Sequence, residues 1–193
     1  MFSILIVDDN ADLVELFSVV LTRNGYKTCS AVSGEECLKL LKISTPDLIL
    51  LDIMMDPMDG WETLTGIRSD RMSQSLPVIM VTGKQPTWDD VRSHMTEIDD
   101  YIVKPLTVSA LAGLVNGFFS HKQVVDEEIA LAKASGADES TLNEYRIIRR
   151  SLDVGIKMKS IIGQREEKTE TALDILKERL TSLQRQYRIT ESY

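Results

Sequence analysis

The sequence has only two cysteines, Cys29 and Cys37, and their spacing fits neither a zinc site nor a disulfide framework. We therefore expect both to be buried as small apolar side chains, and the protein to be cytoplasmic. Long apolar runs are also missing. The run after Met1 holds about five residues, too few for a signal peptide or a membrane span, so we expect no role in a membrane.

Basic residues are scarce in the first part of the chain. The net charge is −8, and residues 1–120 contain 9 basic and 17 acidic residues, whereas residues 121–193 contain 13 of each. An acidic region repels nucleic acid but suits a divalent cation, so we expect the two parts to have different partners. With 43% hydrophobic and 27% charged residues, the chain is long enough for one or two globular domains.

Short runs of Ile, Leu, Val and Met alternate with helical patterns in residues 1–120. Four runs are nearly continuous, as is typical of strands buried on both faces of a parallel sheet, and a fifth is weaker. The five cover residues 4–7, 26–32, 47–51, 78–81 and 101–103. Helical patterns lie between them, for example at residues 12–24, with Leu16 inward, and at residues 33–42, with Ser33 as the cap. This repeat predicts a doubly wound α/β domain with five strands.

Residues 121–193 are predicted to form a helical extension, because helical patterns continue to the end of the chain. One long helix, or two in line, is expected to run from Thr107 until Ser135-Gly136. The second is predicted at residues 139–162, capped by Asp138 or Ser140 and ended by Gly163. The third is predicted at residues 165–188.

The third helix carries apolar residues at alternating spacings of three and four, a coiled-coil seam that packs the helices together or pairs two chains. The seam is Leu173, Leu176, Leu180, Leu183 and Tyr187. A basic cluster lies on the second helix, at Arg146, Arg149, Arg150, Lys157 and Lys159. A solvated face is favoured over a nucleic-acid footprint for this cluster, because the extension is neutral overall.

Polar residues stand where the predicted strands end. Asp8-Asp9 follow the first strand, Asp52 the third, Thr82 the fourth and Lys104 the fifth. Alone, Asp8-Asp9 would be read as a helix cap. The carboxyl ends of parallel strands meet at one edge, however, and ligands of doubly wound sheets bind there. We therefore expect three carboxylates, one hydroxyl and one ammonium to meet.

These groups match the needs of phosphoryl transfer to an aspartate. Clustered carboxylates require a cation, and hard oxygen ligands favour Mg²⁺. Asp52 can then attack phosphorus, while Lys104 and the Thr82 hydroxyl hold phosphoryl oxygens and Gly83 leaves space.

Residues 3–118 resemble the receiver domains of two-component response regulators, through Asp8-Asp9, Asp52, Thr82 and Lys104-Pro105. The resemblance implies a flavodoxin-like strand order 2-1-3-4-5 and Asp52 as the phosphoacceptor. It implies that Asp8, Asp9, Asp52 and the backbone carbonyl of Met54 hold Mg²⁺, and that Thr82 and Tyr101 are switch residues. It also implies a cis peptide bond before Pro105.

Two features depart from that family. Asp56 replaces a proline four residues after the acceptor, and Pro57 comes one position later. Asp56 could reach the metal, although a solvated charge is favoured. The family often has Gly-Ala where this chain has Glu97-Ile98, so we expect a tighter or helical loop before the fifth strand.

The sequence therefore predicts a phosphorelay response regulator with a receiver domain at 1–120 and a helical extension at 121–193. A sensor histidine kinase would donate the phosphoryl group, and the extension would act on a protein effector or self-associate. We expect no enzyme activity beyond transfer to Asp52 and slow hydrolysis. Two alternatives stay open. One is a transcription regulator that binds DNA through the extension. The other is a Mg²⁺-dependent aspartyl phosphatase, although such enzymes resemble a pattern with a second aspartate two residues after the nucleophile, where this chain has Met54.

Overall fold

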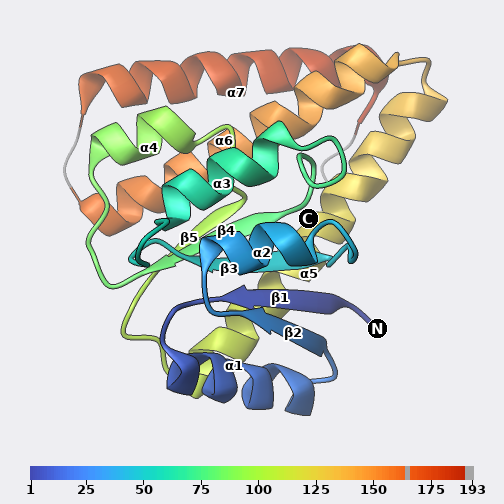
Figure 1. The fold of residues 1–193 in the computed structure, drawn as a ribbon. Coiled ribbons are helices and arrows are strands. Elements are labelled where there is room, and N and C mark those ends of the chain that lie inside the picture. The colour runs from blue at the N-terminus through green and yellow to red at the C-terminus, as the bar shows by residue number, and fades with distance from the viewer. Residues whose placement is uncertain (164–165, 190–193) are drawn as a thin grey trace. The chain divides into compact units, whose positions relative to one another are not determined.

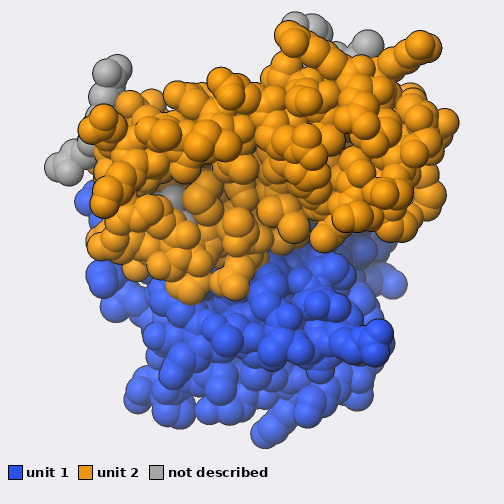
Figure 2. Space-filling view, turned by 90° about the horizontal axis from the view of Figure 1, so that it is seen from above, with its two compact units in different colours: residues 1–85, 100–113 blue, residues 86–99, 114–193 orange. Residues whose placement is uncertain are grey.

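The computed structural model describes residues 1–163 and 166–189, apart from the side chain of Val91 (Figure 1). The chain divides into two compact units, coloured separately in Figure 2. Residues 1–85 and 100–113 form the first, called here the sheet unit, and residues 86–99 and 114–193 the second, called the helical unit. The domain boundary at residue 120 stays a prediction, and the compact units group residues 86–99 and 114–120 with the later helices.

The sheet unit is built on five parallel strands in the predicted order, β2-β1-β3-β4-β5. Their bounds are β1 Ser3–Val7, β2 Lys27–Ala31, β3 Leu48–Asp52, β4 Val78–Thr82 and β5 Asp100–Val103. All residues of β3 and β4 are buried, as expected for central strands of a parallel sheet, which is covered on both faces. The flavodoxin-like doubly wound fold is therefore confirmed.

The strand register aligns the carboxyl ends. Val7 at the end of β1 pairs with Leu51 in β3, and Asp52 at the end of β3 pairs with Val81 in β4. Thr82 at the end of β4 pairs in turn with Val103. The residues that follow these strands therefore emerge at one edge of the sheet.

Helices α1 (Ala11–Arg23), α2 (Gly34–Leu40) and α3 (Gly60–Ser69) complete the sheet unit, with α1 on one face and α2 and α3 on the other (Figure 1). Each begins at a side-chain cap: Asn10, the predicted Ser33, and Asp59, which forms a capping box with Glu62. Two burial predictions were wrong. Cys29 is exposed because β2 is the edge strand, and Leu16 is 44% exposed on the outer side of α1.

The helical unit contains α4 (Trp88–His94), most of α5 (Val108–Ala134), α6 (Glu139–Ile162) and α7 (Glu167–Tyr187). α6 has the predicted bounds, with Asp138 as its cap and Gly163 ending it at φ 69°. α7 lies within the predicted range, whose first residue, Arg165, is outside the described residues. None of the helices in the described ranges is long and apolar enough to cross a membrane.

The leucine seam of α7 packs within one chain. Leu173, Leu180 and Leu183 are buried, and Leu176 and Tyr187 are half-buried. α7 runs antiparallel to α6, as shown by the ion pairs Arg179–Glu144 and Lys159–Glu170. Gly155 of α6 permits the close approach, because a Cβ there would lie 2.4 Å from Leu173 Cδ2. Of the two roles predicted for the seam, the structure shows packing of helices within the chain.

Candidate functional site

Four side chains that follow or end the strands, those of Asp8, Asp9, Asp52 and Lys104, meet at the carboxyl edge of the sheet unit. Oxygens of Asp8, Asp9 and Asp52 all lie within 4.8 Å of one another. Asp8 and Asp52 are each 4% exposed, whereas Asp9 is open to solvent. The structure thus brings together the three carboxylates that the sequence placed at separate strand ends.

Lys104 joins two of these acids. Its Nζ donates to Asp52 Oδ1 and to Asp8 Oδ2, each at 2.7 Å. The backbone N–H of Lys104 donates to the Thr82 carbonyl at 2.6 Å, which continues the pairing of β4 and β5 past the strand end. The Lys104-Pro105 peptide bond is cis, as predicted, and Asp56-Pro57 is cis as well.

Burial governs the ionisation of this group of charges. It raises the pKa of Asp52 above its ordinary value, and the Asp8 charge adds to this, although the Lys104 ammonium and the Met54 N–H oppose it. Burial alone would lower the pKa of Lys104, but hydrogen bonds with Asp52 and Asp8 outweigh it, so the net shift is upward. The ammonium is therefore charged at neutral pH, and it offsets part of the repulsion between the acids.

Asp8 and Asp9 do not cap the helix that follows them. The N-cap of α1 is Asn10, whose side chain accepts from the Leu13 N–H at 3.2 Å. Asp8 instead accepts the Asn10 N–H at 2.9 Å with Oδ1, which fixes its carboxylate. The acidic pair therefore does not cap α1, which is the role that its sequence position alone would have favoured.

The donor set suits a hard divalent cation. It consists of three carboxylates, of which two are buried and one is open to solvent. Mg²⁺ commonly binds only a few carboxylates and keeps several water ligands, so an exposed side of the site suits it. Asp56 is exposed in its loop, as expected for a solvated charge. The Met54 N–H donates to Asp52 Oδ2 at 2.8 Å, so Met54 borders the site, while the role of its carbonyl stays a prediction.

The two predicted switch residues lie inside the protein. Thr82 is fully buried, and its hydroxyl accepts the Lys84 N–H at 3.1 Å. Tyr101 is 4% exposed. The sequence analysis assigned Tyr101 a switch role, and that role stays a prediction. Gly83 has open space where a Cβ would stand.

Gly60 is a supporting residue that the sequence analysis missed. At the start of α3, a Cβ on this residue would lie 2.2 Å from the Asp52 carbonyl oxygen and 2.7 Å from Ile53 Cα. The Gly60 N–H also donates to the Ile53 carbonyl at 3.0 Å. The start of α3 therefore rests directly on the backbone that carries Asp52. A helix-starting glycine after an aspartate cap, Asp59, was the available signal.

Gly60→Ala is expected to destabilise the fold by about 1–3 kcal/mol, because backbone atoms must shift to admit the methyl group. Urea unfolding monitored by circular dichroism measures this loss. Gly117→Ala is the matched control, since nothing lies within 4 Å of its Cβ position in α5, and alanine favours a helix. Equal stability of Gly60→Ala and the unsubstituted protein would contradict the close packing described here.

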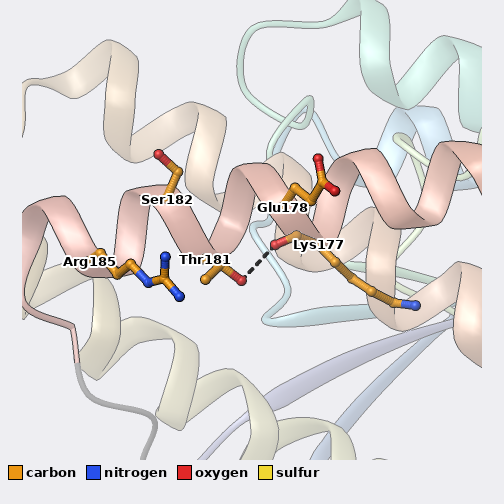
Figure 3. A pocket seen from close by; sticks show the side chains of 5 residues that line it. All are labelled: Lys177, Glu178, Thr181, Ser182 and Arg185. Atoms are coloured by element: carbon orange, nitrogen blue, oxygen red, sulfur yellow. Dashed lines mark hydrogen bonds between the residues drawn. The ribbon is translucent and has the colours of Figure 1, made fainter.

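A separate hollow of about 470 Å³ lies along α7, lined by Lys177, Glu178, Thr181, Ser182 and Arg185 (Figure 3). All five residues come from one helix, and the Thr181 hydroxyl donates to the Lys177 carbonyl at 2.9 Å. No residue from another helix or strand is among the five that line the hollow. This hollow is therefore a helix surface rather than a binding site.

Comparison with known proteins identifies the family of residues 4–116. The response regulator receiver domain family matches residues 4–116. The alkaline phosphatase synthesis transcriptional regulatory protein PhoP of Bacillus subtilis is 33% identical over 121 residues, covering 63% of this chain and 50% of PhoP. The transcriptional regulatory protein AfsQ1 of Streptomyces coelicolor is 38% identical over 104 residues, covering 54% of this chain and 45% of AfsQ1.

Solved structures agree. The N-terminal domain of a response regulator receiver protein from Methanoculleus marisnigri is 44% identical, with a TM-score of 0.53, covering 61% of this chain and 95% of that domain. TrrA of Thermotoga maritima, solved in complex with Mg²⁺ and BeF, is 31% identical with a TM-score of 0.54, covering 61% of this chain and 99% of TrrA. The chain spans about half the length of the curated relatives it matches. Through residues 4–116, this chain belongs to the response regulator receiver domain family.

Proposed function

We propose that this protein accepts a phosphoryl group on Asp52 from a sensor histidine kinase in the cytoplasm and relays the change to a protein effector or through its helical tail. The observation that carries the proposal is the position of Lys104 Nζ, 2.7 Å from both Asp52 and Asp8, within a group of three carboxylates. Family membership supports the phosphorelay role.

The transfer uses the residues at the strand ends. A carboxylate oxygen of Asp52 forms a bond to phosphorus while the bond from phosphorus to the donor's histidine nitrogen breaks, and that nitrogen takes up a proton. Lys104 is positioned to hold a phosphoryl oxygen as a fixed charge, and Thr82 can donate its hydroxyl to another. Slow hydrolysis of the acyl phosphate then returns Asp52 to its free form.

Asp8, Asp9 and Asp52 would hold Mg²⁺, together with the Met54 carbonyl. When bound, the cation neutralises charge on the phosphoryl oxygens and so lets a carboxylate approach them. The clustered oxygens of these acids support this assignment, as does the Mg²⁺ present in the TrrA structure.

The helical tail favours a protein partner over nucleic acid. Relatives that share the receiver domain include the DNA-binding response regulator MtrA of Mycobacterium leprae, but that match covers 112 residues and 48% of MtrA. Three of the basic side chains on α6 are engaged in ion pairs: Arg149 with Glu128, Arg150 with Asp99 and Lys159 with Glu170. Charges occupied in this way are less available to DNA phosphates. We therefore propose that the tail acts on a protein rather than on DNA.

Acetyl phosphate with Mg²⁺ is expected to phosphorylate the full chain, as seen by a shifted band in phosphate-affinity electrophoresis. A chelator added before the donor is expected to remove that band, because the clustered acids then repel the incoming phosphoryl group. Asp56→Asn is the matched control, since Asp56 is an exposed carboxylate in the neighbouring loop and should leave the shift unchanged. A band that forms equally well in chelator would contradict the proposal.

A further inference from the structure

The sheet unit carries most of its positive charge at one edge. The four segments that lead into β1 to β4 are called here the amino edge: residues 1–3, 23–27, 39–47 and 68–77. They contain six basic and two acidic residues, whereas the rest of the sheet unit contains two basic and eleven acidic residues. Backbone hydrogen bonds link these segments, since the Lys27 N–H donates to the Phe2 carbonyl and the Asp47 N–H to the Ser3 carbonyl. This acidic unit therefore presents a basic surface at the edge opposite to the phosphoacceptor site.

Helix ends account for only half of these basic residues. Arg23, Lys39 and Arg68 lie in the last turns of α1, α2 and α3, where the helix dipole favours a cation. The other three lie outside the helices, are exposed and take part in no ion pair with a described residue: Lys27, Lys42 and Arg71. Three positive charges at the amino edge are therefore left for an external partner.

A hollow of about 300 Å³ opens at the amino edge between α2 and α3, which lie side by side on one face of the sheet (Figure 1). Leu38, Leu41 and Lys42 line it from α2 and the turn that follows. Residues of α3 and of the loop after it, including Gly66 and Ser69, line the other side. A Cβ on Gly66 would lie 2.8 Å from Leu38 Cδ1, so the two helices meet closely there. Unlike the hollow on α7, this one is enclosed by two elements.

The walls of this hollow suit an apolar group. The Ser69 hydroxyl donates to the Gly66 carbonyl at 2.9 Å, and the Ser73 hydroxyl donates to the Ile67 carbonyl at 2.8 Å. Both serine protons are therefore already satisfied within the chain, and the leucines of α2 supply apolar surface. The volume is at the lower end for a small-molecule site, whereas one large side chain fits it.

Two large apolar side chains lie beside the residues that line the hollow. Ile43, which follows the lining residue Lys42, is 84% exposed, and Met72, which lies between the lining residues Asp70 and Ser73, is 72% exposed. Asp70 adds a negative charge here, but its carboxylate already accepts the Met72 N–H at 2.7 Å. Exposed apolar groups that surround a hollow are typical of an interaction surface, because a partner that covers them removes them from water.

We propose that the amino edge binds an acidic segment of a partner protein. One large apolar side chain of that segment fills the hollow between α2 and α3, and its carboxylates pair with Lys42, Arg71 and Lys27. Charge complementarity favours an acidic partner, and the hollow favours a protein over nucleic acid, whose phosphates would meet the same cations but bring no aliphatic side chain. Because the opposite edge holds Asp52, this docking leaves the phosphoacceptor open to its donor and does not require phosphorylation.

The test is fluorescence anisotropy of the full chain with a labelled peptide in which glutamates flank a central pair of leucines. Replacing these leucines by serines is expected to weaken binding about tenfold, because the apolar contact in the hollow is lost. Lys42→Glu combined with Arg71→Glu is expected to weaken binding of the leucine peptide about tenfold, and added salt should weaken it as well. Lys84→Glu is the matched control, since it makes the same change of charge on an exposed lysine beyond the end of β4 and should leave binding unchanged.

Ser69→Phe separates docking in the hollow from attraction of charges alone. Its ring is expected to fill the hollow, so that the leucine and serine peptides bind equally well to this variant. Thr65→Phe, on the exposed side of α3 and outside the hollow, should keep the preference for leucine. Circular dichroism checks that each variant is folded.

Three results would overturn the docking proposal. They are absence of peptide binding, equal affinity of the unsubstituted protein for the leucine and serine peptides, and tighter binding of a duplex oligonucleotide than of the leucine peptide. Asp52→Asn is expected to bind the leucine peptide normally, so the docking surface and the phosphoacceptor role are tested independently of each other.

Discussion

Asp52→Asn is expected to reduce phosphoryl uptake from acetyl phosphate to background and, in metal-free buffer, to make the folded chain more stable at neutral pH. Uptake is lost because an amide cannot form the bond to phosphorus. Stability rises because burial disfavours the charge of this carboxylate and the nearby Asp8 charge adds to the cost, and an uncharged side chain removes both effects. Phosphate-affinity electrophoresis and urea unfolding in a chelator measure the two effects.

The gain in stability should depend on pH in a defined direction. The pKa of Asp52 is raised in the folded protein, chiefly by burial, so its contribution to stability is complete below the ordinary aspartate pKa and is lost as pH rises through the raised value. The advantage of Asp52→Asn should therefore grow with pH across that window and stay constant above it. Asp9→Asn, at an exposed carboxylate, is the control. An advantage that shrinks as pH rises would show that the Lys104 contact, rather than burial, dominates.

Lys104→Met is expected to slow phosphoryl uptake by about 100-fold, because the transition state loses a fixed positive charge next to the phosphoryl oxygens. It should also cost about 2 kcal/mol of stability, since Asp8 and Asp52 are both buried and lose the ammonium that they share. Time courses with acetyl phosphate and urea unfolding measure these effects.

Lys27→Met, an exposed lysine on the edge strand β2, is the control for the loss of one positive charge. The double variant Lys104→Met with Asp52→Asn should recover part of the lost stability, because a single buried carboxylate then remains. Normal uptake by Lys104→Met would show that its ammonium plays no part in the transfer.

The sheet and its acidic edge were predictable because continuous runs of Ile, Leu and Val define buried parallel strands, and the strand direction fixes where Asp8, Asp52 and Lys104 emerge. The helix starts at Ser33 and Asp138 were predictable for a local reason, since each side chain accepts a backbone N–H three residues on.

Features that depend on contacts between distant residues were not predictable in this way. The exposure of Cys29 follows from the edge position of β2, and the need for glycine at position 60 follows from its approach to the Asp52 backbone. The grouping of α4 with the tail depends on Arg92 and Arg150, whose partners lie far away in the sequence. A tighter or helical loop before β5 was expected, and the Glu97 and Ile98 N–H groups do donate to the His94 carbonyl as in a helical turn.

The central claim is that the strand-end acids form one pocket in which Asp52 alone takes the phosphoryl group. Borohydride reduction of the phosphorylated chain, followed by peptide mass spectrometry, tests it directly, because an acyl phosphate on aspartate is converted to homoserine. We expect homoserine at position 52 and at no other acid. Homoserine at Asp8, Asp9 or Asp56 with position 52 unchanged would contradict it.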